Sequence, residues 1–314
     1  MQAAILAAGL GTRLRPLTYR VPKALLPVLN RPLLGLLLEQ LQAAGFTRVA
    51  VNTHHLADQV QRFLAEQRPP GLEIEVSHEP EILGTGGGLR GLGEILGGGS
   101  FLVVNADIVT DLDLGNIYHR HLEQAITTLV VHDHPPYNKV WVERNRVVSI
   151  GEPPPGGAGR ALAYTGVQVV SPEIFRYIPA TGPYDLVAAW REALAAGERL
   201  EALVALGHYW QDLGTPANYL AAHWWLLTRP PSHLASFFPG VSDPLIGPGA
   251  MVGGRVHFGS GVCLGAGVSV GAGAFLKNTV IMDNAVIAPR ITLEDCIVGP
   301  GAEVAQSARG KILV

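Results

Sequence analysis

The C-terminal part of this 314-residue chain places an apolar residue at every sixth position over seven consecutive hexads. These residues are Ile246, Val252, Phe258, Leu264, Val270, Leu276 and Met282. Hexapeptide periodicity with glycine-rich corners is typical of a parallel β-helix, and a flexible glycine-rich tail would not keep this register. We therefore predict a short left-handed parallel β-helix over residues 244–308, with about three and a half coils of ~18 residues. The phase is expected to slip after Asn284, with a corner or insertion near Pro289.

The first 228 residues alternate short apolar runs with amphipathic stretches, and a proline-rich linker at 229–243 separates them from the repeats. This alternation predicts a mixed, mainly parallel sheet with helices on both faces, an α/β domain. The strand signals become denser over 127–170, which indicates an antiparallel insertion. We expect strands at 3–7, 48–52, 72–76 and 101–105, and helices at 32–44, at 56–67, from about 184 and from about 216.

A glycine-rich, cationic loop, GLGTRLRPLTYRVPK at residues 9–23, follows the first predicted strand. Glycines after a strand let backbone N–H groups converge on phosphate oxygens. The loop lacks the Lys-Ser or Lys-Thr of a P-loop and the third glycine of a dinucleotide loop. Arg13 supplies a planar donor fork and Lys23 a point charge, a pair that suits a polyphosphate. The loop by itself favours phosphate binding over a purely structural role.

The whole stretch ILAAGLGTRLRPLTYRVPKALLPV, residues 5–28, closely resembles the signature of the sugar-1-phosphate nucleotidylyltransferases. The resemblance extends to about residue 226 through EPEILGTGGGL (79–89), FLVVNADI (101–108), YTGVQVVSPEIF (164–175) and YWQDLGTP (209–216). It implies a Rossmann-like nucleotidyltransferase domain, and a hexapeptide β-helix behind such a domain is common in this family.

The resemblance also implies the residues that bind the nucleotide and the metal. Arg13, Lys23 and Asp107 are the expected catalytic residues, and Asp107 with Asp212 is expected to hold Mg²⁺. Asp107 ends a predicted buried strand, where ligands bind in open α/β sheets, and Mg²⁺ is commonly held by one or two carboxylates plus substrate phosphates. The expected nucleotide-binding residues are Leu6, Ala8, Gly9, Gly11, Thr12, Arg13, Lys23, Glu79, Gly84, Thr85 and Gly87. For Glu79 and Glu81, contact with the base, with structural N–H groups or with solvent remains open.

The expected sugar-phosphate site contains one clear departure from the family pattern and one small change. Family members usually carry Glu-Lys-Pro at the sugar-phosphate contact, whereas this chain reads Gly-Glu-Pro-Pro at 151–154. Lys139 or Arg160 is a candidate to replace the missing lysine. The family's usual Asn-Gly-Asp is Asn105-Ala106-Asp107 here, which keeps the metal ligand. The residues expected to contact the sugar phosphate are Asn105, Lys139, Glu152, Thr165 and Gly166.

The implied reaction joins a nucleoside triphosphate to a sugar-1-phosphate and releases pyrophosphate. The combination with a β-helix favours a mannose-1-phosphate guanylyltransferase-like enzyme. The alternatives are a uridylyl- or thymidylyltransferase acting on a hexose- or amino-sugar-1-phosphate, or a regulatory homologue that binds a nucleotide sugar without turning it over.

Composition limits the partners. The formal net charge of −3 gives no electrostatic footprint for nucleic acid or an anionic membrane. No run approaches the ~20 apolar residues that span a bilayer, and the two cysteines form neither a disulfide framework nor a zinc motif. We expect a cytoplasmic enzyme without nucleic-acid or membrane partners. A homo-oligomer is expected because the end coil of a β-helix leaves strand edges that need covering.

Overall fold

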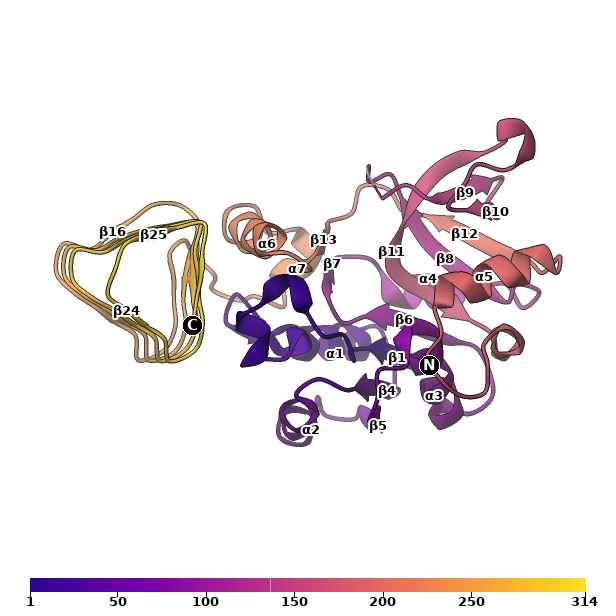
Figure 1. Cartoon of the computed structure of the whole chain (residues 1–314), viewed down its shortest axis with the longest axis horizontal. Helices are drawn as coiled ribbons and strands as arrows, with labels where there is room; N and C mark the ends of the chain where they lie inside the picture. The colour runs from indigo at the N-terminus through magenta and orange to yellow at the C-terminus, as the bar shows by residue number, and fades with distance from the viewer. Residues whose placement is uncertain (136) are drawn as a thin grey trace. The chain divides into compact units, whose positions relative to one another are not determined.

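The structure is a computed structural model that describes residues 1–135 and 137–314 (Figure 1). Its α-helices are α1 (Leu33–Ala43), α2 (Ala57–Glu66), α3 (Gly84–Leu96), α4 (Leu114–His119), α5 (Leu186–Ala195), α6 (Pro216–Thr228) and α7 (Ser232–Ala235). The strands before the repeats are β1 (Gln2–Leu6), β2 (Pro27–Val28), β3 (Arg31–Pro32), β4 (Arg48–Thr53), β5 (Glu73–His78), β6 (Phe101–Asn105), β7 (Ile108–Thr110), β8 (Thr127–His132), β9 (Val140–Glu143), β10 (Arg146–Ile150), β11 (Arg160–Val170), β12 (Leu200–Val204) and β13 (Trp210–Asp212).

Nine strands form one mixed sheet in the order β5-β4-β1-β6-β11-β8-β12-β10-β9. The first four are parallel, and β11 then runs antiparallel to both β6 and β8. Strand β9 also pairs with β11, so the last five strands close on themselves. This confirms the α/β fold, with a parallel half and an antiparallel insertion, that the sequence predicted.

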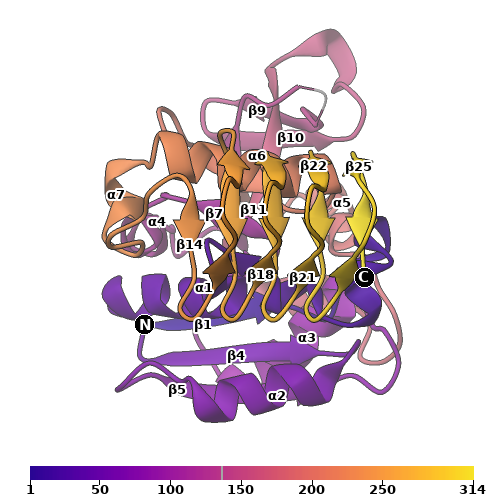
Figure 2. The same ribbon diagram turned by 90° about the vertical axis from the view of Figure 1, so that its left-hand side faces the viewer.

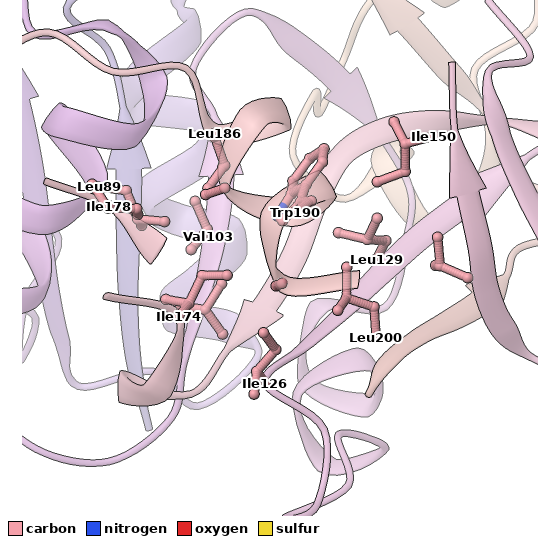
Figure 3. Close-up of a cluster of buried hydrophobic side chains, with 14 of the residues drawn as sticks. Leu89, Val103, Ile126, Leu129, Ile150, Ile174, Ile178, Leu186, Trp190 and Leu200 are labelled. Atoms are coloured by element: carbon pink, nitrogen blue, oxygen red, sulfur yellow. The ribbon is translucent and has the colours of Figure 1, made fainter. Parts of the chain in front are cut away.

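The sheet is stabilised by a continuous apolar core. Trp190 and Leu186 of α5 pack in this core with Leu129 of β8 and Val103 of β6 (Figure 3). All four side chains are at most 3% exposed. Burying an apolar side chain of this size contributes about 1.5–3 kcal/mol, so α5 is a main support of the closed end of the sheet.

The repeats form a three-sided stack of parallel strands, seen end-on as a triangle in Figure 1 and from the side in Figure 2. One row holds five strands and the other two hold four each, which is the β-helix that the hexads predicted. The rows are β14 (Leu245–Ile246), β17 (Val262–Leu264), β20 (Thr279–Ile281), β23 (Ile297–Val298) and β26 (Ile312–Leu313); β15 (Met251–Val252), β18 (Ser269–Val270), β21 (Val286–Ile287) and β24 (Glu303–Val304); and β16 (His257–Phe258), β19 (Phe275–Lys277), β22 (Thr292–Glu294) and β25 (Ala308–Arg309).

The register of the repeat changes earlier than the sequence analysis predicted. Ile281, not Met282, pairs with Leu264 and joins the interior of the stack. The chain shortens the preceding corner by one residue at Asn278, which adopts a left-handed φ of 44°. Asp295 repeats this at the next coil with a φ of 53°, and the Asn278 amide donates to its carboxylate at 2.8 Å. The predicted slip after Asn284 is therefore wrong by one hexad.

The chain divides into two units. The sheet unit comprises Met1–Gly9, Leu37–Ala106 and Leu112–His208, and the β-helix unit comprises Leu10–Leu36, Asp107–Asp111 and Tyr209–Val314. The segment 10–36 groups with the β-helix because its leucines share a buried cluster with α6 and with the outward side chains of the five-strand row. This division differs from the one expected from the sequence, which separates domains at the linker 229–243. No helix in the described ranges is long and apolar enough to cross a membrane.

Candidate active site

The cationic loop forms three short 3₁₀ turns at Thr12–Leu14, Leu17–Tyr19 and Lys23–Leu25. Leu14 and Leu17 are fully buried, which anchors the loop and leaves Arg13 exposed. Gly11 has a φ of 61°, and a Cβ there would lie 2.8 Å from Cγ2 of Thr18. Thr18 in turn donates a hydrogen bond to the Gly11 carbonyl at 2.9 Å. The glycine is thus required by the local fold of the loop.

Gly9 differs from Gly11 because the residues around Gly9 leave space for a side chain. A Cβ built at Gly9 would meet none of the described atoms within 4 Å. It follows the buried strand β1, after Leu6 at the strand end and the buried Ala8. A position of this kind leaves the backbone open to close approach by a phosphate group.

Lys23 and Asp107, 84 residues apart in the sequence, form an ion pair in the β-helix unit. The lysine side chain is 12% exposed and the aspartate side chain 32%. Partial burial weakens the screening of such a pair by solvent. The structure therefore brings together two of the three predicted catalytic residues.

A two-stranded ribbon places Asp212 next to this pair. Strand β13 runs antiparallel to β7, Asp212 lies opposite Ile108, and the Leu213 N–H donates to the Asp107 carbonyl at 2.8 Å. Burial raises the pKa of Asp212, and the Asp107 charge raises it further, while Lys23 and Arg13 lower it. These four side chains therefore share one local electrostatic field.

The two aspartates have the chemistry of a site for a hard divalent cation. Among the described residues, Oδ1 of Asp212 is buried and has no hydrogen-bond partner. A Cβ at Gly214 would meet this oxygen at 2.7 Å and would also collide with the Arg13 guanidinium. Mg²⁺ prefers carboxylate oxygens together with phosphate oxygens and water. Asp107 and Asp212 fit that requirement.

In the sheet unit, Glu79 belongs to a buried hydrogen-bond network. Its Oε1 accepts a hydrogen bond from the Asn52 amide at 2.6 Å, and its Oε2 accepts one from the Leu83 N–H at 3.0 Å. Oδ1 of Asn52 also accepts from the Ala7 N–H at 2.6 Å. Of the roles considered for Glu79, the structure shows the one toward structural N–H groups. Asn52 was not predicted, and its signal is a buried asparagine near the end of the apolar run VAVN.

The glycine run at 84–88 forms the first turn of helix α3. Its glycines allow close approach by the chain's own segment 182–186: a Cβ would lie 2.7 Å from the Tyr184 carbonyl at Gly84, and 2.9 Å from the Gly182 carbonyl at Gly87. The Thr85 hydroxyl accepts from the Leu186 N–H at 3.1 Å. These residues therefore position α3 against the segment that leads into α5.

Asn105 and Gly166 meet at the predicted sugar side. Gly166 has a φ of 86°, and a Cβ there would lie 3.1 Å from the Asn105 amide nitrogen. Thr165 is fully buried, and its hydroxyl donates to the Val130 carbonyl at 2.9 Å. The pairing of β11 with β8 is irregular at this point, between Tyr164 and Gln168. Thr165 thus stabilises the irregular strand, and Gly166 leaves space beside Asn105.

The closed end of the sheet brings Lys139 beside the Gly151–Glu152 segment. The Gly151 N–H donates to the Lys139 carbonyl at 2.6 Å, and the Lys139 N–H donates to the Leu162 carbonyl at 3.0 Å. The second candidate, Arg160, instead pairs with Asp133, with both side chains more than half exposed.

A further cation at this position was not predicted. Arg191 of α5 donates to the Ile150 carbonyl at 3.1 Å, and its guanidinium lies against Gly151. It follows a buried tryptophan in an amphipathic helix, so its sequence carries no local signal of a site. Lys139 and Arg191 both adjoin the segment where the family lysine is missing.

Comparison with protein-family models matches residues 2–228 to the nucleotidyl transferase family. This chain belongs to that family. Residues 241–312 match a second model, the GMPPB C-terminal domain. The two matches cover the loop, both aspartates and the β-helix.

The relatives of this nucleotidyltransferase are named for activities on several different sugar phosphates. It is 31% identical to the mannose-1-phosphate guanylyltransferase catalytic subunit beta of Danio rerio, over 98% of this chain and 89% of that one. It is 34% identical to the N-acetylmuramate alpha-1-phosphate uridylyltransferase of Neisseria meningitidis, over 71% of this chain and all of the relative. With the UTP–glucose-1-phosphate uridylyltransferase of Synechocystis the identity is 32%, and the match spans 64% of that relative's length. The family is thus that of the sugar-1-phosphate nucleotidyltransferases, as the loop resemblance predicted.

Solved structures of similar fold include HddC from Yersinia pseudotuberculosis, with a TM-score of 0.60 and 24% identity over 70% of this chain and 97% of that one. The UDP-glucose pyrophosphorylase from Acinetobacter baumanii gives a TM-score of 0.63 with 21% identity, over 76% and 96% of the two chains. At this level of identity they show that the nucleotidyltransferase domain shares their fold.

Proposed function

We propose that this protein is a Mg²⁺-dependent nucleotidyltransferase that converts a nucleoside triphosphate and a sugar-1-phosphate into a nucleoside-diphosphate sugar and pyrophosphate. The ion pair of Lys23 with Asp107, next to Asp212, carries the proposal. The favoured substrates are GTP and mannose-1-phosphate. Support for them comes from the Danio rerio relative, which matches nearly the whole chain, and from the match of the β-helix to the GMPPB C-terminal domain.

In this reaction a phosphate oxygen of the sugar-1-phosphate attacks the α-phosphorus of the triphosphate. The bond from that phosphorus to the bridging oxygen breaks, and pyrophosphate leaves. Transfer of this kind depends on positioning and on neutralising the phosphate charge more than on a covalent intermediate. The chain therefore has to supply cations and fixed donors at the triphosphate.

Arg13 and Lys23 supply the positive charge. The backbone at Gly9 is open to approach by a phosphate, and the turn at Gly11–Thr12 supplies further backbone N–H groups. Asp107 and Asp212 hold Mg²⁺, which adds charge neutralisation at the phosphates when bound. Because Asp107 already pairs with Lys23, the lysine is held near the position where the phosphate charge has to be stabilised.

The sugar phosphate is assigned to Lys139, with Asn105, Glu152 and Gly166 contacting the sugar. Lys139 adjoins Gly151–Glu152, whereas Arg160 is engaged by Asp133. A lysine at this position weakens the argument for a regulatory homologue, whose main support was the missing lysine after Glu152.

A uridylyltransferase acting on an acidic or amino-sugar phosphate is the second candidate. The Neisseria relative supports it, because its full length aligns at 34% identity. The two candidates share the transfer machinery and differ in base and sugar.

A pyrophosphate-release assay with Mg²⁺ tests the proposal across four nucleoside triphosphates and several sugar-1-phosphates. Turnover of GTP with mannose-1-phosphate is expected, and preference for UTP with N-acetylmuramate-1-phosphate would favour the second candidate. Absence of release over the whole matrix, with nucleotide-sugar binding retained, would leave the regulatory homologue.

A cytoplasmic homo-oligomer remains our proposal for the assembled enzyme. Among the described strands, β14, β15 and β16 begin their rows and pair on one side, and Ile246 and Met251 there are 47% and 65% exposed. Open strand edges with exposed apolar side chains favour association with another copy.

A further inference from the structure

The hairpin that follows Lys23, formed by β2 and β3, is held by hydrogen bonds from two elements of the β-helix unit. Strands β2 and β3 are joined by Leu29 and Asn30, whose φ angles are 48° and 64°. Only a few residues separate this turn from the 3₁₀ turn Lys23–Leu25. Any displacement of the hairpin is therefore transmitted to Lys23 over a short length of chain.

Helix α6 provides the first set of hydrogen bonds. The Tyr219 hydroxyl donates to the Pro27 carbonyl, and Nε2 of His223 accepts from the Leu29 N–H at 3.3 Å. Both side chains are at most 1% exposed. Buried hydrogen bonds of this kind hold a backbone in one conformation because their loss leaves unsatisfied groups.

The β-helix provides the second set of hydrogen bonds, through the side chain of Asn30. The Asn30 amide donates to the Leu264 carbonyl at 2.7 Å, and its carbonyl oxygen accepts from the Cys263 thiol at 3.1 Å. Burial raises the pKa of Cys263 to about 12, so the thiol stays protonated and remains a donor. One side chain thus joins the turn to two consecutive residues of β17.

Apolar packing extends this contact along the β-helix. The side chains that the five-strand row turns outward share a buried cluster with leucines of the loop and hairpin; its members include Leu14, Leu17, Leu26, Leu29, Cys263, Val280, Met282 and Ile297. A Cβ at Gly299 would lie 3.5 Å from Leu17. The segment carrying Lys23 therefore packs directly on one face of the β-helix.

We propose that the β-helix acts in nucleotidyl transfer by holding the Lys23 loop in its working position, with Asn30 as the positioning residue that links the two. This rests on the proposed function for the meaning of Lys23, but the mechanical link stands on the hydrogen bonds and packing. Asn30 does not touch the substrate in this scheme. It acts through the hairpin on the lysine.

Asn30→Gly tests the link, because glycine accepts the left-handed φ without strain while both side-chain hydrogen bonds are lost. We expect about a tenfold lower kcat with the KM for sugar-1-phosphate changed less than twofold, as for loss of a transition-state interaction. Asn284→Gly is the matched control. Asn284 is an exposed β-helix asparagine with a left-handed φ of 59°, and the same change there is expected to leave kcat as in the wild type.

Amide hydrogen exchange separates this proposal from the proposed function. The Leu25 and Leu26 N–H groups bond to the carbonyls of Pro22 and Lys23 at 2.8 and 3.2 Å, and Asn30→Gly is expected to speed their exchange about tenfold. Unchanged exchange with unchanged kcat overturns the link, as does an equal loss in Asn284→Gly. If the wild type releases no pyrophosphate but the exchange responds, the link stands and the proposed function fails.

Discussion

In the β-helix unit, Lys23 already pairs with Asp107, and Asp212 lies beside them on the adjoining strand; in the sheet unit, Lys139 is held next to Gly151 through its backbone. The first group sits on a ribbon and a loop that share a buried core with the β-helix. The second sits where strands of the closed sheet end, and Glu152 there is exposed.

This difference has a chemical consequence. Charges that are paired and partly buried are preorganised, which favours stabilisation of the transition state. An exposed lysine at a strand end acts mainly on substrate binding. Substitutions in the β-helix unit are therefore expected to lower turnover, and those at the sheet end to weaken sugar-phosphate affinity.

The largest effect is expected from Asp107→Asn. The change removes the proposed metal ligand and the partner of Lys23 while keeping the shape of the side chain, so kcat should fall by about a thousandfold or more. Steady-state pyrophosphate release measures it. Asp113→Asn is the control, because Asp113 caps α4 by accepting from the Asn116 N–H and asparagine caps as well. Near-normal turnover in Asp107→Asn would remove this residue from the metal site.

A second test concerns the support of the loop at acidic pH. Burial lowers the pKa of His223 to about 4, from 6.5 in the unfolded chain. As the pH falls below 6.5, His223 becomes protonated in the unfolded state but stays neutral in the folded state until about pH 4. The free energy of unfolding therefore decreases. The loss is about 1.4 kcal/mol per pH unit, or roughly 2 kcal/mol from pH 6.5 to 5.

Urea unfolding followed by tryptophan fluorescence at pH 7 and pH 5 measures this loss. His223→Gln keeps polar atoms but does not titrate, so its free energy of unfolding should fall less between these pH values. Equal pH dependence in both proteins would show that His223 is not protonated on unfolding in this range.

The smallest effect is expected at the sugar side. Lys139→Ala should raise the KM for sugar-1-phosphate about tenfold with little change in kcat, because in the proposed site its charge contacts the phosphate equally in the ground and transition states. Arg160→Ala should leave that KM unchanged, since Arg160 is exposed and paired with Asp133. The reverse result would exchange their roles and place the sugar phosphate beside Arg160.

Sequence patterns predicted the repeating and contiguous features well. Strand β6 begins and ends where the run FLVVN does. The hexads located Leu264, Val270 and Leu276 in the interior of the β-helix, with Phe258 packed against that cluster. The register failed at Met282 because Asn278 shortens a corner in a left-handed conformation, which apolar periodicity does not reveal.

The candidate site was predicted where a local motif carries it. Arg13, Lys23, Asp107 and Asp212 were expected together, and the structure brings them into one electrostatic field. Asn52 and Arg191 were missed because each acts through partners far away in the sequence.

The sequence by itself therefore determined the β-helix and the class of transfer chemistry, because a six-residue period and a contiguous loop are local patterns. Only the tertiary structure decided that the Lys23 loop shares its core with the β-helix and that Lys139, not Arg160, adjoins Gly151. Those outcomes depend on which distant segments pack and which strands close the sheet. Such pairings follow from the burial of many side chains at once, and no short stretch of sequence encodes them.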